Sequence, residues 1–288
     1  MKENNFRAGK GILPSANMPN SPLGDEGKET LIIIKIGGNI IDDEEKLFLF
    51  LKDFSSVDEK KILVHGGGKL ATQMTVRLGI PQQLIEGRRI TNAETLKVVT
   101  MVYAGYINKN IVSQLQLHNC NAIGLTGADG NSIQAHKRNH PQIDYGFAGD
   151  VDSVNAELLQ LFLDNNISLI FAPLTHDKKG QLLNTNADTI AQESAKAMTD
   201  KYDINLIYSF EKNGVLENAE DDNTVIKQID QESYKNLKQR GVIFAGMIPK
   251  LDNAFSALNS GVKKVIIGKA EHIHQLIKGE AGTTIINK

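Results

Sequence analysis

The sequence predicts an α/β protein, a three-layer sandwich in which helices cover both faces of a mostly parallel central sheet. Three observations lead to this class. Apolar runs of strand length alternate with segments in which apolar residues recur at helical spacing. The runs are apolar throughout and rich in β-branched residues, which is typical of strands buried on both faces of a parallel sheet. Glycines or polar residues follow several runs, at the strand ends where such sheets bind ligands.

The elements of the N-terminal half follow in order. Residues 1–30 contain three prolines and scattered Gly, Ser and Asn, so we expect a flexible extension there. A strand is expected at 31–38 and a second at 61–65, which three glycines connect to a further helix. Between the two strands a helix is indicated by four apolar residues at helical spacing, namely Leu47, Phe50, Leu51 and Phe54.

The middle of the chain continues the alternation. A long helix is expected to begin at Thr91, because Thr91 and Glu94 have the spacing of a capping box. Residues 121–127 predict a strand, and the polar segment 133–150, broken by Pro and Gly, predicts a peripheral hairpin. A helix and the strand 167–174 follow, the helix being indicated by Val154, Leu158, Leu161 and Phe162.

The pattern restarts after Thr175. We expect a helix at 186–198, entered through a capping box of Thr185 and Asp188, and a strand at 205–210. Further elements are two helices and a final strand, at 231–239, 250–258 and 263–268.

Composition favours an enzyme that acts on a small molecule. The chain has 288 residues, of which 41% are hydrophobic, and a net charge of −2, so no basic surface for nucleic acid or an anionic membrane is expected. The single Cys120 cannot form an internal disulfide. We find no apolar signal segment and no run of ~20 apolar residues, and therefore expect a cytoplasmic protein.

The glycine turn at residues 65–68 admits three interpretations: a phosphate cradle at a helix N-terminus, a dinucleotide turn, or an esterase oxyanion hole. The dinucleotide pattern does not follow the first strand, and Glu86, the expected ribose ligand, lies in a turn-like segment. No serine has the Gly-x-Ser-x-Gly setting of an esterase, and Leu70 breaks a Walker motif. A phosphate site without a Walker motif is therefore favoured.

Two lysines are candidate cations for that site. Lys35 lies in an apolar strand just before the glycine pair 37–38, where an unpaired ammonium would be costly to bury. Lys250 opens a helix, where an ammonium opposes the helix dipole unless an anion lies beside it. Asp188, in the first turn of another helix, can orient nearby lysines.

Candidates for substrate recognition flank these residues. Asn184 and Asn186 alternate with other residues where a loop enters a helix, and two asparagines exceed what capping requires. Arg89 follows Gly87, and a bidentate guanidinium is a suitable receptor for a carboxylate. The histidines and Cys120 lack ligand-like grouping, so the sequence predicts no metal ligands from the protein.

The ordered motifs K-x-G-G, H-G-G-G, G-R-R-I-T, N-x-N-A-D and G-M-I-x-K resemble those of the amino acid kinase family, over Leu31 to Lys288. The resemblance implies an enzyme that phosphorylates the side-chain carboxylate of an N-acylated glutamate with ATP and Mg²⁺, on the route to arginine. Acetyl is the default acyl group, and succinyl is an alternative. Carbamate kinase, aspartokinase and uridylate kinase activities are disfavoured by Arg89 and Asn184, and a catalytically silent homologue by retention of both lysines.

The resemblance also implies roles for individual residues. Lys35 and Lys250 would neutralise the transferring phosphoryl group, with Asp188 holding both. Gly37 and Gly38 would donate N–H groups to the ATP phosphates. The acceptor would be bound by Gly67, Gly68, Arg89, Asn184 and Asn186. The nucleotide would lie against Phe210, Glu211, Asn213, Gly214, Val215, Leu216, Val242, Ile243 and Phe244, of which the first two replace a Ser-Asp pair common in relatives.

In this family the first part of the fold binds the acceptor and the second binds the nucleotide. The resemblance thus divides the chain into an extension at 1–30, an acceptor-binding and dimerisation part at 31–178 and an ATP-binding part at 179–288. Arginine-inhibited relatives form hexamers through an N-terminal helix, which three prolines interrupt here. We therefore expect a homodimer that arginine does not inhibit.

Overall fold

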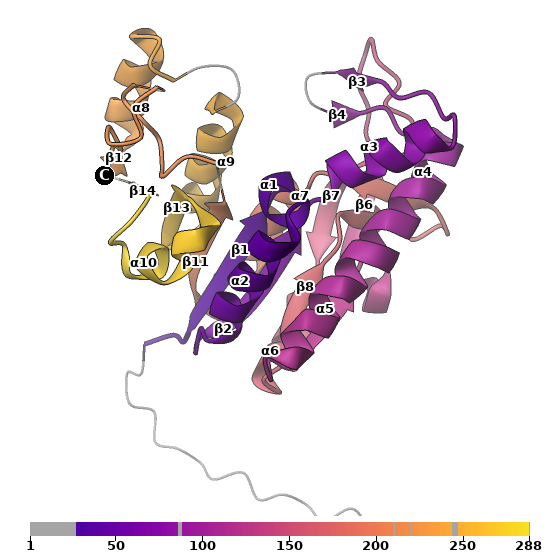
Figure 1. Cartoon of the computed structure of the whole chain (residues 1–288), viewed down its shortest axis with the longest axis horizontal. Coiled ribbons are helices and arrows are strands. Elements are labelled where there is room, and N and C mark those ends of the chain that lie inside the picture. Colours follow the sequence, from indigo (N-terminus) through magenta and orange to yellow (C-terminus); the bar gives the residue numbers. More distant parts are fainter. Residues whose placement is uncertain (1–26, 86–87, 210, 219, 244–246, 288) are drawn as a thin grey trace, which may run out of the picture.

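An eight-stranded sheet forms the middle layer of the computed structural model, which describes residues 27–85, 88–209, 211–218, 220–243 and 247–287 (Figure 1). Its strand order is β12-β14-β13-β11-β1-β2-β8-β5. The six strands from β13 to β5 are parallel, and β14 is antiparallel to β13. The strands are β1 (Thr30–Ile36), β2 (Lys60–His65), β5 (Ala122–Leu125), β8 (Ser168–Phe171), β11 (Asp203–Ser209), β12 (Gln228–Ile229), β13 (Lys264–Gly268) and β14 (Thr283–Ile285).

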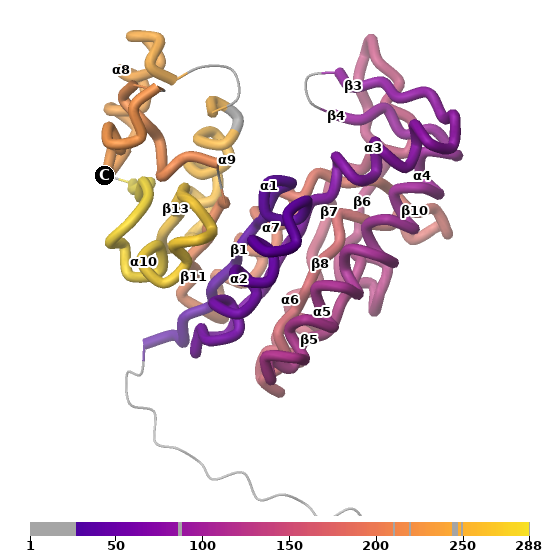
Figure 2. The backbone as a smooth tube through the Cα atoms, viewed as in Figure 1, coloured from indigo at the N-terminus to yellow at the C-terminus, as the bar shows by residue number. Residues whose placement is uncertain are grey.

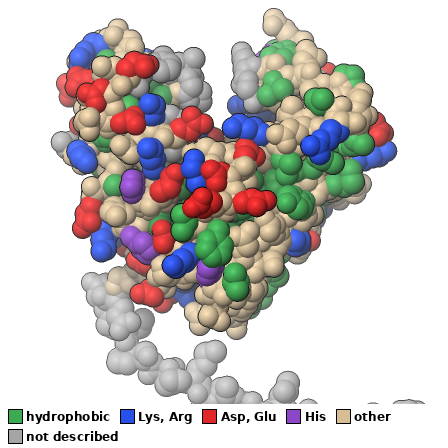
Figure 3. Space-filling model, viewed as in Figure 1, with side chains coloured by type: hydrophobic (Ala, Val, Ile, Leu, Met, Phe, Trp, Pro, Cys, Tyr) green, Lys and Arg blue, Asp and Glu red, His purple; other side chains and the backbone are tan. Residues whose placement is uncertain are grey.

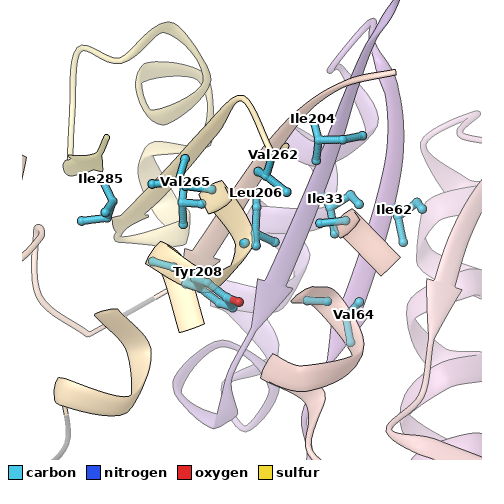
Figure 4. Packing of buried hydrophobic residues seen from close by; sticks show 14 of the residues in the cluster. Ile33, Ile62, Val64, Ile204, Leu206, Tyr208, Val262, Val265 and Ile285 are labelled. Carbon is cyan, nitrogen blue, oxygen red and sulfur yellow. The ribbon is translucent and has the colours of Figure 1, made fainter. Parts of the chain in front are cut away.

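Helices cover both faces of this sheet, which confirms the predicted three-layer α/β sandwich. Alternate residues of β1 point to opposite layers: Leu31 and Ile33 belong to one hydrophobic cluster, and Ile32 and Ile34 to the other. Figure 4 shows part of the first cluster, in which residues of β1, β2, β11 and β13 lie side by side. That cluster is covered by α6 (Ala156–Asp164), α7 (Ala187–Ala197), α8 (Gln231–Gln239) and α9 (Ile248–Asn259).

The opposite layer is covered by the remaining helices. They are α1 (Gly38–Ile41), α2 (Glu44–Ser55), α3 (Gly68–Arg77), α4 (Ala93–Thr100), α5 (Asn108–Leu117) and α10 (Ile273–Lys278). The four residues that indicated α2 are all buried. Between α4 and α5 the chain winds more widely, as a π-helical segment η1 (Met101–Ile107), and two short 3₁₀ turns are η2 (Asp129–Asn131) and η3 (Ala270–His272).

Three local expectations are wrong in detail. The long helix begins with Asn92 as its N-cap, not Thr91, because the Asn92 side chain accepts from Thr95 N. Asn186 caps α7 in place of Thr185. In α6 the buried residues are Leu159 and Leu163, whereas Leu161 is exposed, so the predicted apolar face is shifted around the helix.

The segment predicted as a peripheral hairpin is antiparallel but not peripheral. Strands β6 (Ile133–Lys137) and β7 (Ala148–Val154) close a small barrel with β9 (Leu174–His176) and β10 (Leu182–Thr185). Tyr145, in the loop of this hairpin, is fully buried. The barrel stands at the carboxyl end of the main sheet, and β9 and β10 were not anticipated from the sequence.

Two groups of elements rise above the carboxyl edge of the sheet. Figure 2 shows α8 and α9 on one side, and α3 with the hairpin of β3 (Leu84–Ile85) and β4 (Arg88–Arg89) on the other. The predicted extension falls mostly on residues 1–26, and Glu86 on 86–87, which lie outside the described residues. Within the described ranges no helix has both the length and the hydropathy to cross a membrane.

The glycine turn joins β2 to α3 as predicted, and Gly67 has two reasons to be glycine. Its φ is 146°, which side-chain-bearing residues rarely adopt. A Cβ atom there would lie 2.4 Å from Ile107 Cδ1 and 3.0 Å from Tyr103 Cδ1. At Gly68, the first residue of α3, a Cβ atom would have no neighbour within 4 Å.

We therefore expect Gly67→Ala to destabilise the fold by about 1–3 kcal/mol, through backbone strain and overpacking against η1. The matched control is Gly68→Ala, which we expect to be neutral or slightly stabilising, because alanine is the better helix residue. Urea unfolding followed by circular dichroism measures both. Equal stability of the two variants would contradict the conformational requirement at Gly67.

Candidate active site

A cavity of about 650 Å³ opens at the carboxyl edge of the sheet, where the predicted site residues converge. Figure 3 shows the molecule hollowed between its two upper groups of elements. The cavity is lined by Lys35, Gly37, Gly38, Gly66, Gly67, Gly68, Lys69, Thr72, Gln73, Leu84, Arg88, Arg89, Tyr103, Arg138, Tyr145, Ala148, Gly149, Pro173, Asn184, Thr185, Asn186, Ala187 and Asp188. The set contains most residues predicted to bind phosphates or acceptor, brought together from β1, the glycine turn, β4 and the start of α7.

Asp188 joins the two predicted lysines. Its Oδ1 lies 2.9 Å from Lys35 Nζ, and its Oδ2 lies 3.5 Å from Lys250 Nζ. All three side chains are mostly buried. Burial opposes ionisation of Asp188, but the two ammonium groups outweigh it and hold the pKa of this carboxyl below its usual value. Asp188 is therefore ionised near neutral pH and lies between the two lysine side chains.

Local structure places each member of this ion triad. Lys35 is the penultimate residue of β1 and lies beside Tyr208 of β11 and Val64 of β2. Asp188 is in the first turn of α7, where its N–H donates to the Asn186 side chain at 2.7 Å. Lys250 is in the first turn of α9. Asp188 thus supplies the anion that the unfavourable position of Lys250 at a helix N-terminus requires.

Arg89 is held by neutral groups. Its Nη2 donates to Gly68 O at 3.0 Å and to Thr72 Oγ1 at 2.7 Å, and its Nη1 donates to Gln82 Oε1. Among the described residues no carboxylate pairs with Arg89. The guanidinium at the cavity wall is therefore available to pair with an anion.

The two asparagines have different partners. Asn184 lies in β10, and its Nδ2 donates to Thr91 Oγ1 at 3.0 Å, which leaves its carbonyl oxygen without a partner among the described residues. The side-chain oxygen Oδ1 of Asn186 accepts hydrogen bonds from Asp188 N and Thr189 N, so this oxygen caps the N-terminus of α7. Only the amide nitrogen of Asn186 remains for a ligand.

Several lining residues were missed by sequence reasoning. Tyr103 faces the cavity from η1, and burial raises its pKa despite the nearby Arg89, so the phenol stays neutral. Arg138 is paired with Asp150 across β6 and β7, and Tyr145 lies close to it. Arg138 and Tyr145 were not considered as site residues because their segment was expected to be a peripheral hairpin. Tyr103 was missed because no pattern in the sequence indicates the π-helical segment to which it belongs.

The predicted nucleotide-base residues do not line this cavity. Glu211 and Asn213 lie in the loop after β11, Val242 and Ile243 lie after α8, and the side chains of Val215 and Ile243 are buried in the core. Gly214 and Leu216 are likewise buried. Phe210 and Phe244 lie outside the described residues. The base and ribose contacts therefore stay a prediction.

A protein-built metal cage is not found within the described ranges, where no three His, Cys, Asp or Glu side chains group as metal ligands. Asp188 is the one acidic side chain among the residues lining the cavity, and both its oxygens face lysines. This arrangement is compatible with Mg²⁺ that keeps most of its waters and is held by substrate phosphates.

Comparison with known proteins gives a consistent result. The sequence profile of the amino acid kinase family matches residues 30–269. The chain is 56% identical over 250 residues to the acetylglutamate kinase of Cytophaga hutchinsonii, covering 86% of this chain and 95% of that protein. It is also 52% identical over 247 residues to the acetylglutamate kinase of Parabacteroides distasonis, covering 86% of this chain and 97% of that protein.

Solved structures share the fold. The N-acetylglutamate synthase of Neisseria gonorrhoeae, complexed with coenzyme A and N-acetyl-glutamate, superposes with a TM-score of 0.76 at 18% identity, over 90% of this chain and 60% of that one. At this identity the likeness concerns the fold alone.

The two lysines should contribute unequally to the lowered pKa of Asp188, because they lie at different distances from its carboxylate. Lys35→Met removes the nearer cation, so the carboxyl pKa of Asp188 should rise above its usual value; Lys250→Met should raise it less. Because the lowered pKa stabilises the fold only above the unfolded value, both variants should lose stability at neutral pH and little at strongly acidic pH. Carbon-13 NMR of the carboxyl group measures the pKa.

The control is Lys69→Met, which also removes a cation from the cavity wall. Lys69 lies 3.7 Å from Asp42, so its loss should leave the pKa of Asp188 unchanged. A rise equal to that of Lys35→Met would mean that the cavity's overall charge, and not the triad, sets the pKa.

Proposed function

This chain belongs to the amino acid kinase family, and we propose that it is an acetylglutamate kinase, which uses ATP to phosphorylate the side-chain carboxylate of N-acetyl-L-glutamate. The products are an acyl phosphate and ADP, in arginine biosynthesis. The observation that carries the proposal is the ion triad: its Lys35 and Asp188 line the same cavity as the unpaired Arg89, and its Lys250, which is not a lining residue, is paired with Asp188. Cation sites for two anionic substrates therefore share one space.

The reaction requires no general base. A carboxylate is ionised at neutral pH and attacks as it is, so the barrier consists mainly of bringing two anions together and stabilising the charge that moves between them. Lys35 and Lys250 lie where they can neutralise the phosphoryl oxygens, and Gly37 and Gly38 can donate N–H groups to the ATP phosphates. Asp188 keeps both ammonium groups in place.

The acceptor lies at the other end of the cavity in this proposal. Arg89 binds the α-carboxylate of the glutamate, and Asn184 and Asn186 bind its neighbouring polar groups. Gly67 and Gly68 offer N–H groups to the carboxylate that is phosphorylated. The rigid attachment of Arg89 to α3 through Gly68 and Thr72 fixes the distance between the α-carboxylate receptor and the glycine turn.

ATP completes the site from the second part of the chain. We propose that residues 31–178 bind the acceptor and that 179–288 bind the nucleotide, with the base against the loops that follow β11 and α8. Mg²⁺, held by phosphate oxygens and water, supplies further neutralisation of the phosphates when bound.

An exposed apolar face supports a homodimer. Phe48 and Leu49 of α2, Met101 and Tyr106 of η1, and Leu117 of α5 are all exposed. Figure 3 shows hydrophobic side chains over these helices on one face of the molecule. We propose that this face pairs with its copy in a cytoplasmic dimer, because exposed apolar side chains that gather on one face mark association sites.

The function and the division of roles are tested together by ADP release coupled to NADH oxidation. We expect turnover with ATP, Mg²⁺ and N-acetyl-L-glutamate, and a lower kcat/KM with N-succinyl-L-glutamate. Lys250→Ala should lower kcat by about 10²–10³-fold with little change in the KM for glutamate substrate, because its ammonium acts on the transferring group. Arg89→Ala should mainly raise that KM, by at least about tenfold.

The opposite pattern in the two variants would overturn these roles. Absence of turnover with any N-acylglutamate would overturn the function itself. A higher kcat/KM with the succinyl substrate would keep the reaction and replace the acyl group.

The dimer predicts a mass of twice 31.6 kDa by light scattering. Leu117→Asp should shift the protein toward monomer, because a charge would be buried in the interface. Leu161→Asp is the matched control, since Leu161 is also exposed but lies on α6, in the opposite layer. A monomeric or hexameric wild type, or dissociation by Leu161→Asp, would contradict the proposed face.

A further inference from the structure

A buried chain of hydrogen bonds lies beneath the glycine turn and has no part in the chemistry described so far. His65 is the last residue of β2, and its side chain is fully buried. Its Nδ1 lies 2.7 Å from Gly66 O, and its Nε2 lies 3.2 Å from Asn108 Nδ2. Asn108, the first residue of α5, is buried as well.

The partners of these side chains determine where the protons lie. A carbonyl oxygen only accepts, so His65 Nδ1 carries the proton and donates it to Gly66 O. Asn108 Nδ2 donates to Ile170 O at 2.9 Å, and Asn108 Oδ1 accepts from Lys109 Nζ at 3.1 Å. The amide orientation is therefore fixed, and its second N–H faces His65 Nε2, which must be unprotonated to accept.

Burial keeps this imidazole neutral. Loss of solvation lowers the pKa of His65 to about 4; the bond to Gly66 opposes this effect, and the nearby Lys109 ammonium adds to it. Near neutral pH the ring thus has one proton and one bare nitrogen, as the hydrogen bonds require.

The bond to Gly66 decides the direction of the next N–H group. The described peptide bonds are all trans, and in a trans peptide the C=O and N–H point to opposite sides. Since Gly66 C=O points to the buried His65 ring, the N–H of Gly67 points away from that ring, and Gly67 is one of the residues that line the cavity. No described residue accepts a hydrogen bond from this N–H.

We propose that His65 is a positioning residue, which holds the Gly66–Gly67 peptide so that the Gly67 N–H meets the side-chain carboxylate of the acceptor. The proposal rests on the proposed function for the identity of that acceptor. Glycine peptides rotate more readily than others, so a turn of three glycines needs such a tether to stay preorganised for an anion.

The residues around the hydrogen-bond chain of Gly66, His65 and Asn108 leave these groups little freedom to move. At Gly124, on β5, a Cβ atom would lie 1.9 Å from Asn108 Oδ1, so this glycine gives the amide its space. Tyr103 and Ile107 of η1 lie so close to Gly67 that a Cβ atom there would come within 3.0 Å of the first and 2.4 Å of the second. The π-helical segment thus limits the space around Gly67, and Asn108, the first residue of α5, holds the His65 ring. π-helical turns are frequent at functional sites.

Three substitutions separate the hydrogen bond from the volume of the ring. His65→Phe keeps the ring and removes the donor. His65→Asn keeps an N–H near the position of Nδ1, whereas His65→Gln places its amide near Nε2 and cannot reach Gly66 O. We expect His65→Phe to raise the KM for N-acetyl-L-glutamate and to lower kcat, each by about tenfold, with the KM for ATP within about twofold of wild type. His65→Asn should recover most of the loss, and His65→Gln should not.

Nitrogen-15 NMR of the wild-type protein tests the hydrogen bonds of His65 without any substitution. Between pH 6 and 8 we expect His65 with a protonated Nδ1 and a bare Nε2, and a shift of the Gly67 amide on addition of N-acetyl-L-glutamate. A protonated Nε2 would overturn the proposed role of His65. So would wild-type values of KM and kcat in His65→Phe, or equal changes of KM and kcat in the Asn and Phe variants. Absence of turnover by the wild type would instead overturn the proposed function.

Discussion

The carboxylate of Asp188 is the interaction on which the site depends, because it ties together three segments that are distant in the sequence. Lys35 comes from β1 in the middle of the sheet, and Lys250 from α9 near the C-terminus. Each lysine alone would be an uncompensated charge in a mostly buried place, which is costly. The carboxylate that the two lysines share reduces this cost for both of them.

The two ends of the cavity hold their cations in different ways. The lysines share a carboxylate, so part of their charge is already neutralised, whereas Arg89 is bound only by neutral oxygen atoms. In the proposed function, the cation without a carboxylate partner is therefore the one that binds the α-carboxylate of the acceptor. The partly neutralised lysines are those proposed to contact the transferring phosphoryl group, and weaker binding of the ground state would favour its transfer.

The sequence was sufficient for the sheet, because runs such as 31–34 are apolar on both sides of the strand. The triad was predicted through the resemblance to the amino acid kinase family, since the residues alone favoured a role for Lys35 and left that of Lys250 open. The sequence was insufficient where tertiary contacts decide. The N-caps moved by one residue, since Asn92 and Asn186 compete well with threonine for the same N–H groups. The barrel strand β10 is four residues long, too short for a periodic signal.

The pairing of β1 with β11 has a mechanical consequence. The two strands are hydrogen-bonded along their length, from Thr30 opposite Asp203 to Lys35 opposite Tyr208, so the halves of the molecule share a single continuous sheet. A hinge motion between the halves would break the hydrogen bonds between β1 and β11. We therefore expect that any opening of the cavity bends the elements that project above the sheet, while Lys35, which lies within the paired part of β1, keeps its position.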